Sequence, residues 1–204
     1  NDRVEPASLT KIMTAYLSFK ALKNGQLKLD QVLPISEKAW RVEGSKMFID
    51  TTMTVTVDEL LHGMIIQSGN DASIALAEGI GATEETFATL MNKEAARLGM
   101  KNTHYMNATG LPDPQHYTTA YDLSLLAAAL IRDFPDQYKR LYSVKEYTYN
   151  KITQPNRNRL LFIDPTVDGM KTGHTESAGY CLISSAKRGD GRFISVVLGA
   201  ANDN

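Results

Sequence analysis

Pro6-Ala7-Ser8-Leu9-Thr10-Lys11 opens the first helix of the chain and decides the fold. The apolar residues that follow recur at helical spacing, and Asn24-Gly25 end the run: Leu9, Ile12, Met13, Tyr16 and Leu17. Ser8 and Lys11 are three residues apart, so a helix places both side chains on one face within hydrogen-bond reach. A serine becomes a nucleophile when a neighbouring base takes its proton, and a lysine can be that base if its pKa is lowered. An N-capping serine followed by an ordinary surface lysine fits the same residues.

The composition excludes several classes of protein. The chain has 204 residues, 43% of them hydrophobic and 22% charged, which suits a globular domain with a substantial core. A net charge of −1 without a Lys/Arg block gives no electrostatic surface for nucleic acid. Cys181 is the only cysteine and lies in an apolar run, so we expect it to pack as a small hydrophobic side chain. No apolar run reaches the roughly 18 residues that span a membrane.

Hydrophobic periodicity predicts helices in the first two thirds of the chain and strands at its end. We expect further helices over residues 58–67, with Asp58 as the cap, and over 71–80, 83–98 and 120–131. The stretch 104–118 is rich in Asn, Gly, Pro and Asp and predicts a long loop. We expect strands over 51–57, 142–149, 160–163 and 167–172, and a terminal hairpin of 179–186 and 193–200. Together these elements predict an α+β fold, with helices packed on an antiparallel sheet.

Two further short motifs place polar side chains at the ends of predicted elements. Ser68-Gly69-Asn70 lies between two helices, where a hydroxyl and an amide can face a cleft, although a plain turn uses the same residue types. Lys171-Thr172-Gly173-His174 follows apolar residues on a predicted strand. Its glycine allows a ligand to approach the backbone, and its lysine and threonine can bind a carboxylate. A plain strand that ends in a polar turn also explains the run from Lys171 to His174.

The three motifs occur in one chain in the order S-x-x-K, S-x-N and K-T-G, in helix, inter-helix turn and strand contexts. With them, the sequence resembles the low-molecular-mass penicillin-binding proteins, the serine D-alanyl-D-alanine carboxypeptidases of the peptidase S11 type. The S-G-N version and the histidine after K-T-G match that branch, as do the stretches 6–11, 67–71, 156–158 and 167–175. The resemblance covers essentially the whole chain and implies a β-lactamase/transpeptidase-like fold.

The resemblance also implies a role for each catalytic residue. Ser8 would attack the carbonyl between two terminal D-alanines, forming an acyl-enzyme and releasing one D-alanine. Lys11 would be the base, neutral because it is desolvated and near Lys171. Ser68 would relay a proton to the leaving amine with Lys171 behind it, and Asn70 would hold both the substrate amide and Lys11.

The resemblance further implies how the substrate is bound. Lys171 and Thr172 would hold the terminal carboxylate beside Gly173, and the backbone N–H groups of Ser8 and His174 would form the oxyanion hole. The implied partners are peptidoglycan stem peptides ending in D-Ala-D-Ala, and β-lactams, which would acylate and inhibit the enzyme. No cofactor is implied. The four histidines show no metal-ligand spacing, so we expect no metal: His62, His104, His116 and His174.

Parts of the family pattern have no counterpart here. Members usually begin with strands before the S-x-x-K helix, and end with a helix that closes the sheet, a small β domain and a membrane-anchoring tail. We therefore expect residues 1–204 to be one catalytic domain, truncated at both ends and lacking a carboxylate-binding arginine beyond the last strand. Arg157 resembles a family arginine that pairs with an acidic residue, for which Asp133 is the candidate. Periplasmic residence, peripheral on the inner membrane, is implied by the resemblance alone.

Two other functions fit the same motifs. A class A-like β-lactamase would use the same nucleophile, but would need a glutamate on a loop after the second motif to position a deacylating water. The comparable residues 104–107 include no acid, so we expect slow deacylation and inhibition by β-lactams. A non-catalytic peptidoglycan-binding module would keep the cleft but would not require the pair of Ser8 and Lys11. Accidental motifs on an unrelated fold are a third possibility.

Overall fold

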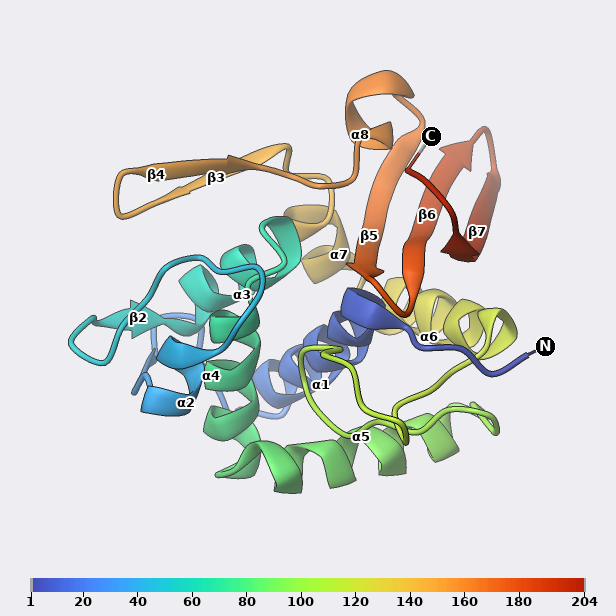
Figure 1. Cartoon of the computed structure of the whole chain (residues 1–204). Helices are drawn as coiled ribbons and strands as arrows, with labels where there is room; N and C mark the ends of the chain where they lie inside the picture. The colour runs from blue at the N-terminus through green and yellow to red at the C-terminus, as the bar shows by residue number, and fades with distance from the viewer. Residues whose placement is uncertain (1, 204) are drawn as a thin grey trace.

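Helix α1 (Lys11–Lys23) runs through the centre of the molecule, and the other elements surround it (Figure 1). The structure is a computed structural model that describes residues 2–203. Ten of the 13 residues of α1 are buried, so protein surrounds this helix along most of its length, and only its C-terminal end is exposed. A short 3-10 turn, η1 (Ala7–Thr10), leads directly into α1 and carries Ser8.

Three of the predicted helices pack against α1 and are confirmed: α3 (Val57–Ile66), α4 (Asn70–Gly81) and α5 (Glu84–Arg97). The short helix α2 (Glu37–Arg41) packs on α4. The predicted strand over 51–57 is wrong for most of its length, because only β2 (Val55–Thr56) is extended, paired with β1 (Val32–Leu33). The cap of α3 is Thr56 and not Asp58. Thr56 and Glu59 form a reciprocal capping box that ends the extended segment there.

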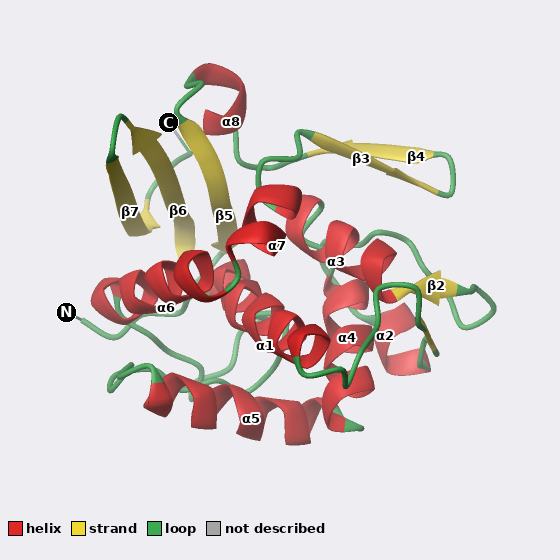
Figure 2. Ribbon diagram, turned by 180° about the vertical axis from the view of Figure 1, so that it is seen from behind, coloured by secondary structure: helices red, strands yellow, loops and turns green. Residues whose placement is uncertain are grey.

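The sheet consists of three antiparallel strands in the order β5 (Val167–Thr175), β6 (Gly179–Arg188) and β7 (Gly191–Ala200). The predicted terminal hairpin is confirmed, and its strands extend until only two residues, Gly189 and Asp190, connect them. Helix α6 (Ala120–Asp133) packs against β7, and η1 packs against β5 (Figure 2). Cys181, on the middle strand, is buried as expected.

The segment between α6 and the sheet departs most from the sequence prediction. It contains α7 (Pro135–Leu141), the hairpin β3 (Glu146–Tyr149) and β4 (Ile152–Pro155), and the short helix α8 (Leu160–Ile163). The predicted strand over 160–163 is wrong, because this apolar run forms α8. The side chain of Asn158 accepts a hydrogen bond from Leu160 N at the start of that turn. Figure 1 shows the β3–β4 hairpin lying above α3, away from the sheet.

Among residues 2–203, no helix combines the length and the apolar character needed to cross a bilayer. Within the same range, no three His, Cys, Asp or Glu side chains gather where they could hold a metal ion.

Candidate active site

Lys11 lies at the centre of the candidate site. Its Nζ is 2.8 Å from Ser8 Oγ, 2.7 Å from Asn70 Oδ1 and 2.8 Å from the carbonyl oxygen of Thr109. The 3-10 turn followed by α1 brings Ser8 and Lys11 to one face, as their spacing predicts, and α4 supplies Asn70 from its first residue. Three segments that are far apart in the sequence therefore meet at the amine of Lys11.

The environment of Lys11 disfavours its charged form. The side chain is buried, with an exposed fraction of 1%. Burial lowers the pKa of Lys11 well below its ordinary value, and the positive charges of Lys171 and Arg157 lower it further, while the carboxylate of Asp71 acts in the opposite direction. A neutral Lys11 was expected from the sequence, and the direction of this pKa shift agrees with it.

Ser68 and Lys171 form a second buried pair beside the first. Lys171 Nζ donates to Ser68 Oγ over 3.0 Å and to the carbonyl oxygen of Thr172 over 2.9 Å. Burial, and then the charge of Arg157, lowers the pKa of Lys171 to about 7. Ser68 has a positive φ of 61°, a conformation that costs energy for a residue with a side chain and is often found at functional sites.

Asn70 is fixed from behind by the loop that precedes β2. Its Nδ2 donates to Glu43 O over 2.6 Å, and its backbone N–H donates to Ser45 O over 2.7 Å. The neighbouring residue, Asp71, is fully buried and accepts backbone N–H groups from residues 47–49 at 2.9–3.2 Å. The carboxylate of Asp71 therefore holds the loop that in turn orients the amide of Asn70.

Strand β5 borders the nucleophile. A Cβ at Gly173 would lie 3.0 Å from the backbone nitrogen of Ser8, so only a glycine allows the strand to approach η1 this closely. Lys171 is buried and Thr172 is half-buried, whereas the exposed ring of His174 packs against Tyr180 in a tilted arrangement, with 4.2 Å between centroids. All eight predicted site residues thus lie in or beside one site, but the imidazole of His174 has its own partner.

Comparisons with known proteins agree with this geometry. A model of the peptidase S11 family, described as D-alanyl-D-alanine carboxypeptidase, matches residues 1–202. The chain belongs to this family. D-alanyl-D-alanine carboxypeptidase DacC of Escherichia coli K12 is 48% identical over 100% of this chain and 52% of its own length. This S11 chain thus spans about half the length of the curated relatives that it matches.

Solved structures show the same fold as this S11 chain. Penicillin binding protein 5 from Haemophilus influenzae is 47% identical with a TM-score of 0.93, covering 97% of this chain and 59% of the other. Penicillin-binding protein D2 from Listeria monocytogenes, solved in the ampicillin-bound form, is 33% identical with a TM-score of 0.89, covering 98% and 82%. The predicted penicillin-binding, transpeptidase-like fold is therefore confirmed.

Sequence reasoning missed the loop that supplies the third hydrogen-bond partner of Lys11 in this S11 chain. The side chain of Asn107 accepts from the backbone N–H groups of Thr109 and Gly110, at 3.3 and 2.7 Å, and donates to Leu111 O. This turn aims the carbonyl of Thr109 at Lys11. The run Asn-Ala-Thr-Gly at 107–110 is a readable turn signal, because Asn side chains bond to the backbone two or three residues on. Every residue has a backbone carbonyl, so the sequence does not indicate which carbonyl accepts from Lys11.

The predicted pair of Arg157 and Asp133 is wrong. Asp133 pairs with Arg132 at 2.8 Å and accepts a hydrogen bond from the Tyr16 hydroxyl at 2.7 Å. Arg157 is exposed, and its Nε donates to Gln67 O over 3.3 Å, next to Ser68. Its charge therefore acts on the two buried lysines instead of being neutralised by Asp133.

His116, behind the nucleophile turn, makes the stability of this S11 chain dependent on pH. Its Nε2 lies 2.8 Å from Thr10 Oγ1, and its Nδ1 accepts from Met106 N. Burial lowers its pKa from 6.5 to about 4. His116 therefore binds a proton more tightly in the unfolded chain than in the folded chain. As a result, the free energy of unfolding decreases as the pH falls from 6.5 through 4. Between pH 7 and pH 4.5 this one group accounts for about 2 kcal/mol, at about 1.4 kcal/mol per unit of pKa.

Denaturant unfolding at the two pH values measures this contribution. In His116→Gln, the loss of unfolding free energy between pH 7 and pH 4.5 should shrink by about 2 kcal/mol, while Lys93→Gln, a substitution at an exposed position, should keep the loss of the unchanged chain. An equal pH dependence in all three proteins would contradict this assignment.

Proposed function

We propose that this chain is the catalytic part of a serine D-alanyl-D-alanine carboxypeptidase. It removes the terminal D-alanine of peptidoglycan pentapeptides through an acyl-enzyme, and β-lactams acylate and inhibit it. The observation that carries the proposal is the buried amine of Lys11, 2.8 Å from Ser8 Oγ and with a pKa well below its ordinary value. A binding module has no need of such a pair.

Hydrogen-bond counting supports Lys11 as the general base. A neutral amine has two N–H donors and one lone pair. Asn70 Oδ1 and Thr109 O can only accept, so they use both N–H groups. The lone pair is then left for the hydroxyl of Ser8, which can donate its proton. Asn70 and Thr109 therefore orient the base toward the nucleophile.

The reaction proceeds in two steps. Ser8 Oγ attacks the carbonyl between the two D-alanines as its proton passes to Lys11, and the peptide C–N bond then breaks. Ser68, bonded to Lys171 at 3.0 Å, relays the proton that Lys11 took from Ser8 to the departing nitrogen, so D-alanine leaves as the free amine and Lys11 is neutral again. A water then gives a proton to Lys11 as its oxygen attacks the acyl-enzyme, and Lys11 returns that proton to Ser8 Oγ as the shortened peptide leaves.

Positive charge and backbone donors bind the substrate's charged groups. Lys171 and Thr172 hold the terminal carboxylate, and the exposed guanidinium of Arg157 adds to the positive potential there. The backbone N–H groups of Ser8 and His174 stabilise the oxyanion, and the close contact at Gly173 keeps β5 beside Ser8. The names of the family and of DacC, and the ampicillin bound by the Listeria relative, support this choice of substrate and inhibitor.

The hydrogen bonds of Glu84 disfavour a β-lactamase. Glu84 is the carboxylate behind the loop of Thr109, and it is engaged by Ala108 N at 2.9 Å and Lys38 Nζ at 2.9 Å. It is therefore not available to activate a water.

We further propose that residues 1–204 form one catalytic domain and that the enzyme works in the periplasm, where its substrate lies.

Incubation with benzylpenicillin tests the proposal. Intact-mass measurement should show one stable adduct per chain over minutes to hours, and no adduct in Ser8→Ala. A transient adduct with accumulating hydrolysed drug would indicate a β-lactamase instead. No adduct in a chain shown to be folded would contradict acylation of Ser8. Release of D-alanine from a D-Ala-D-Ala pentapeptide, lost in the same variant, completes the test.

A further inference from the structure

Strand β5 contains one residue more than its neighbour β6 shortly before the K-T-G motif. At the start of the strand, Val167 is opposite Ala186. The next opposed pair is Gly169 and Ser185, so Asp168 is the extra residue of a β-bulge. Bulges are frequent next to active sites, where they redirect a side chain. This one lies three residues before the lysine of the motif.

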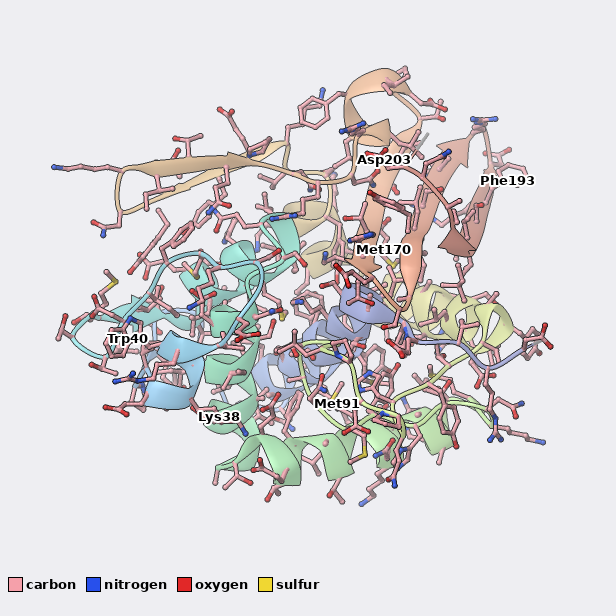
Figure 3. All side chains as sticks on the ribbon, viewed as in Figure 1. Lys38, Trp40, Met91, Met170, Phe193 and Asp203 are labelled. Carbon is pink, nitrogen blue, oxygen red and sulfur yellow. The ribbon has the colours of Figure 1, made fainter. Side chains whose placement is uncertain are left out.

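The bulge decides on which face of the sheet Lys171 lies. Lys171 is opposite Ile183, and its amine reaches Ser68 at 3.0 Å. Figure 3 shows Met170, the residue before Lys171, where β5 approaches the start of α1. Successive side chains of a strand point to opposite faces, so a shift by one residue reverses all of them. Without the extra residue, Lys171 would be opposite Leu182, and its side chain would point away from Ser68.

The carboxylate of Asp168 ties the bulge to the other two strands of the sheet. Arg192 Nη1, on β7, donates to both carboxylate oxygens of Asp168 at 2.9 Å. The same nitrogen donates to the hydroxyl of Ser185 over 2.7 Å, and Ser185 is the fully buried residue of β6 opposite the bulge. Hydrogen bonds between charged groups are stronger than neutral ones. One guanidinium thus joins the extra residue of β5 to both β6 and β7.

Helix α7 supplies a second partner of Asp168. Tyr138 Oη donates to Asp168 Oδ1 over 2.9 Å, and burial raises the pKa of this hydroxyl, so it keeps its proton. The strand also lies directly against this hydroxyl, because a Cβ at Gly169 would collide with it. Asp168 therefore accepts from two elements, and neither donor belongs to a residue that touches the substrate in the proposed reaction.

We propose that Asp168 is a positioning residue of the reaction. Its carboxylate fixes the bulge and so aims the amine of Lys171 at Ser68. The inference rests on the proposed function, in which these two residues relay the proton to the leaving group. Loss of the carboxylate leaves Tyr138 and Arg192 without this acceptor. The strand is then free to move toward the regular register, in which Lys171 lies on the other face.

A double-mutant cycle on the rate of acylation by benzylpenicillin tests the proposal. Asp168→Ala should slow acylation by about 10²-fold, the cost typical of a group displaced by about 1 Å in an active site. Lys171→Gln alone should slow it at least as much. Since Asp168 acts through Lys171, Asp168→Ala should cost less than about twofold when Lys171→Gln is already present. A purely structural role predicts the same loss in both backgrounds.

Tyr138→Phe keeps the proposal testable if Asp168→Ala does not fold. It removes one donor to the carboxylate and retains the ring that stacks on Tyr142. It should slow acylation about fivefold, as expected for one lost hydrogen bond, and less than about twofold in the Lys171→Gln background. Thermal unfolding of each sample shows that the compared chains are folded.

Asp164→Ala is the matched control. Asp164 also pairs with an arginine of the sheet, Arg188 on β6, at 2.9 Å, but it precedes the bulge. This variant should acylate within about twofold of the original rate. Equal losses in both backgrounds, or an original rate in folded Asp168→Ala, would overturn the inference. An original rate in Lys171→Gln would instead contradict the role that the proposed function gives to this lysine.

Discussion

Replacing Lys11 with methionine should slow acylation by benzylpenicillin by about 10³-fold, since removing a general base typically costs 10²–10⁴. Methionine has a similar length and no charge, so it fills the same buried space without accepting a proton. Three oxygens then lose their partner: Ser8 Oγ, Asn70 Oδ1 and Thr109 O. The hydroxyl of Ser8 keeps its proton at neutral pH and remains a weak nucleophile.

The rate of adduct formation by intact mass, with thermal unfolding of the same samples, measures this effect. Lys23→Met places the same substitution at the exposed end of the same helix and should acylate at the original rate. An acylation rate within tenfold of the original in a folded Lys11→Met would contradict the assignment. It would transfer the role of base to Lys171, whose pKa is about 7.

Asp71→Asn should lower the free energy of unfolding by about 3–5 kcal/mol, because buried charge-assisted hydrogen bonds contribute about 1.5–3 kcal/mol each. The carboxylate of Asp71 is fully buried and accepts the backbone N–H groups of Met47, Phe48, Ile49 and Ala72. An asparagine has only one oxygen, and its NH₂ group would face at least one of these N–H donors. The loop of residues 43–49, which orients Asn70, should loosen as a result.

Denaturant unfolding measures the loss of stability, and the acylation rate measures the disordering of Asn70. Asp50→Asn is the matched control, since Asp50 is half-buried and accepts from Thr52 at 2.6–2.8 Å within its own turn. Equal unfolding free energies in Asp71→Asn and Asp50→Asn would show that the buried hydrogen bonds do not stabilise the loop.

Several features of the site are readable from the sequence because side chains at the ends of predicted elements carry them. Ser8 and Lys11 meet because of their spacing on a helical turn, which is a local property. Ser68 and Lys171 meet across 103 residues, yet the apolar pattern marks both the end of the helix before Ser68 and the strand that carries Lys171. The motifs thus name the groups, and the packing of α4 and β5 against the start of α1 brings them together.

Other features depend on contacts that no local pattern encodes. The apolar run 160–163 is too short for its periodicity to distinguish a strand from a helix. In the structure, Leu160 N donates to the side chain of Asn158, and this hydrogen bond favours the start of a helix there. The carbonyl of Thr109 is an acceptor that every residue possesses, so only its direction in the structure singles it out. The erroneous pairing of Arg157 with Asp133 has the same origin, because charge alone does not select a partner.

The hydrogen bonds around Lys11 have a consequence for how the molecule folds. Lys11 is separated from its partners Asn70 and Thr109 by 59 and 98 residues. Long loops must therefore close before any of these bonds forms, and proteins dominated by such distant pairings fold slowly. No short piece of the chain contains the assembled site. During refolding, covalent reactivity with penicillin would thus appear together with the native state and not with the earlier collapse.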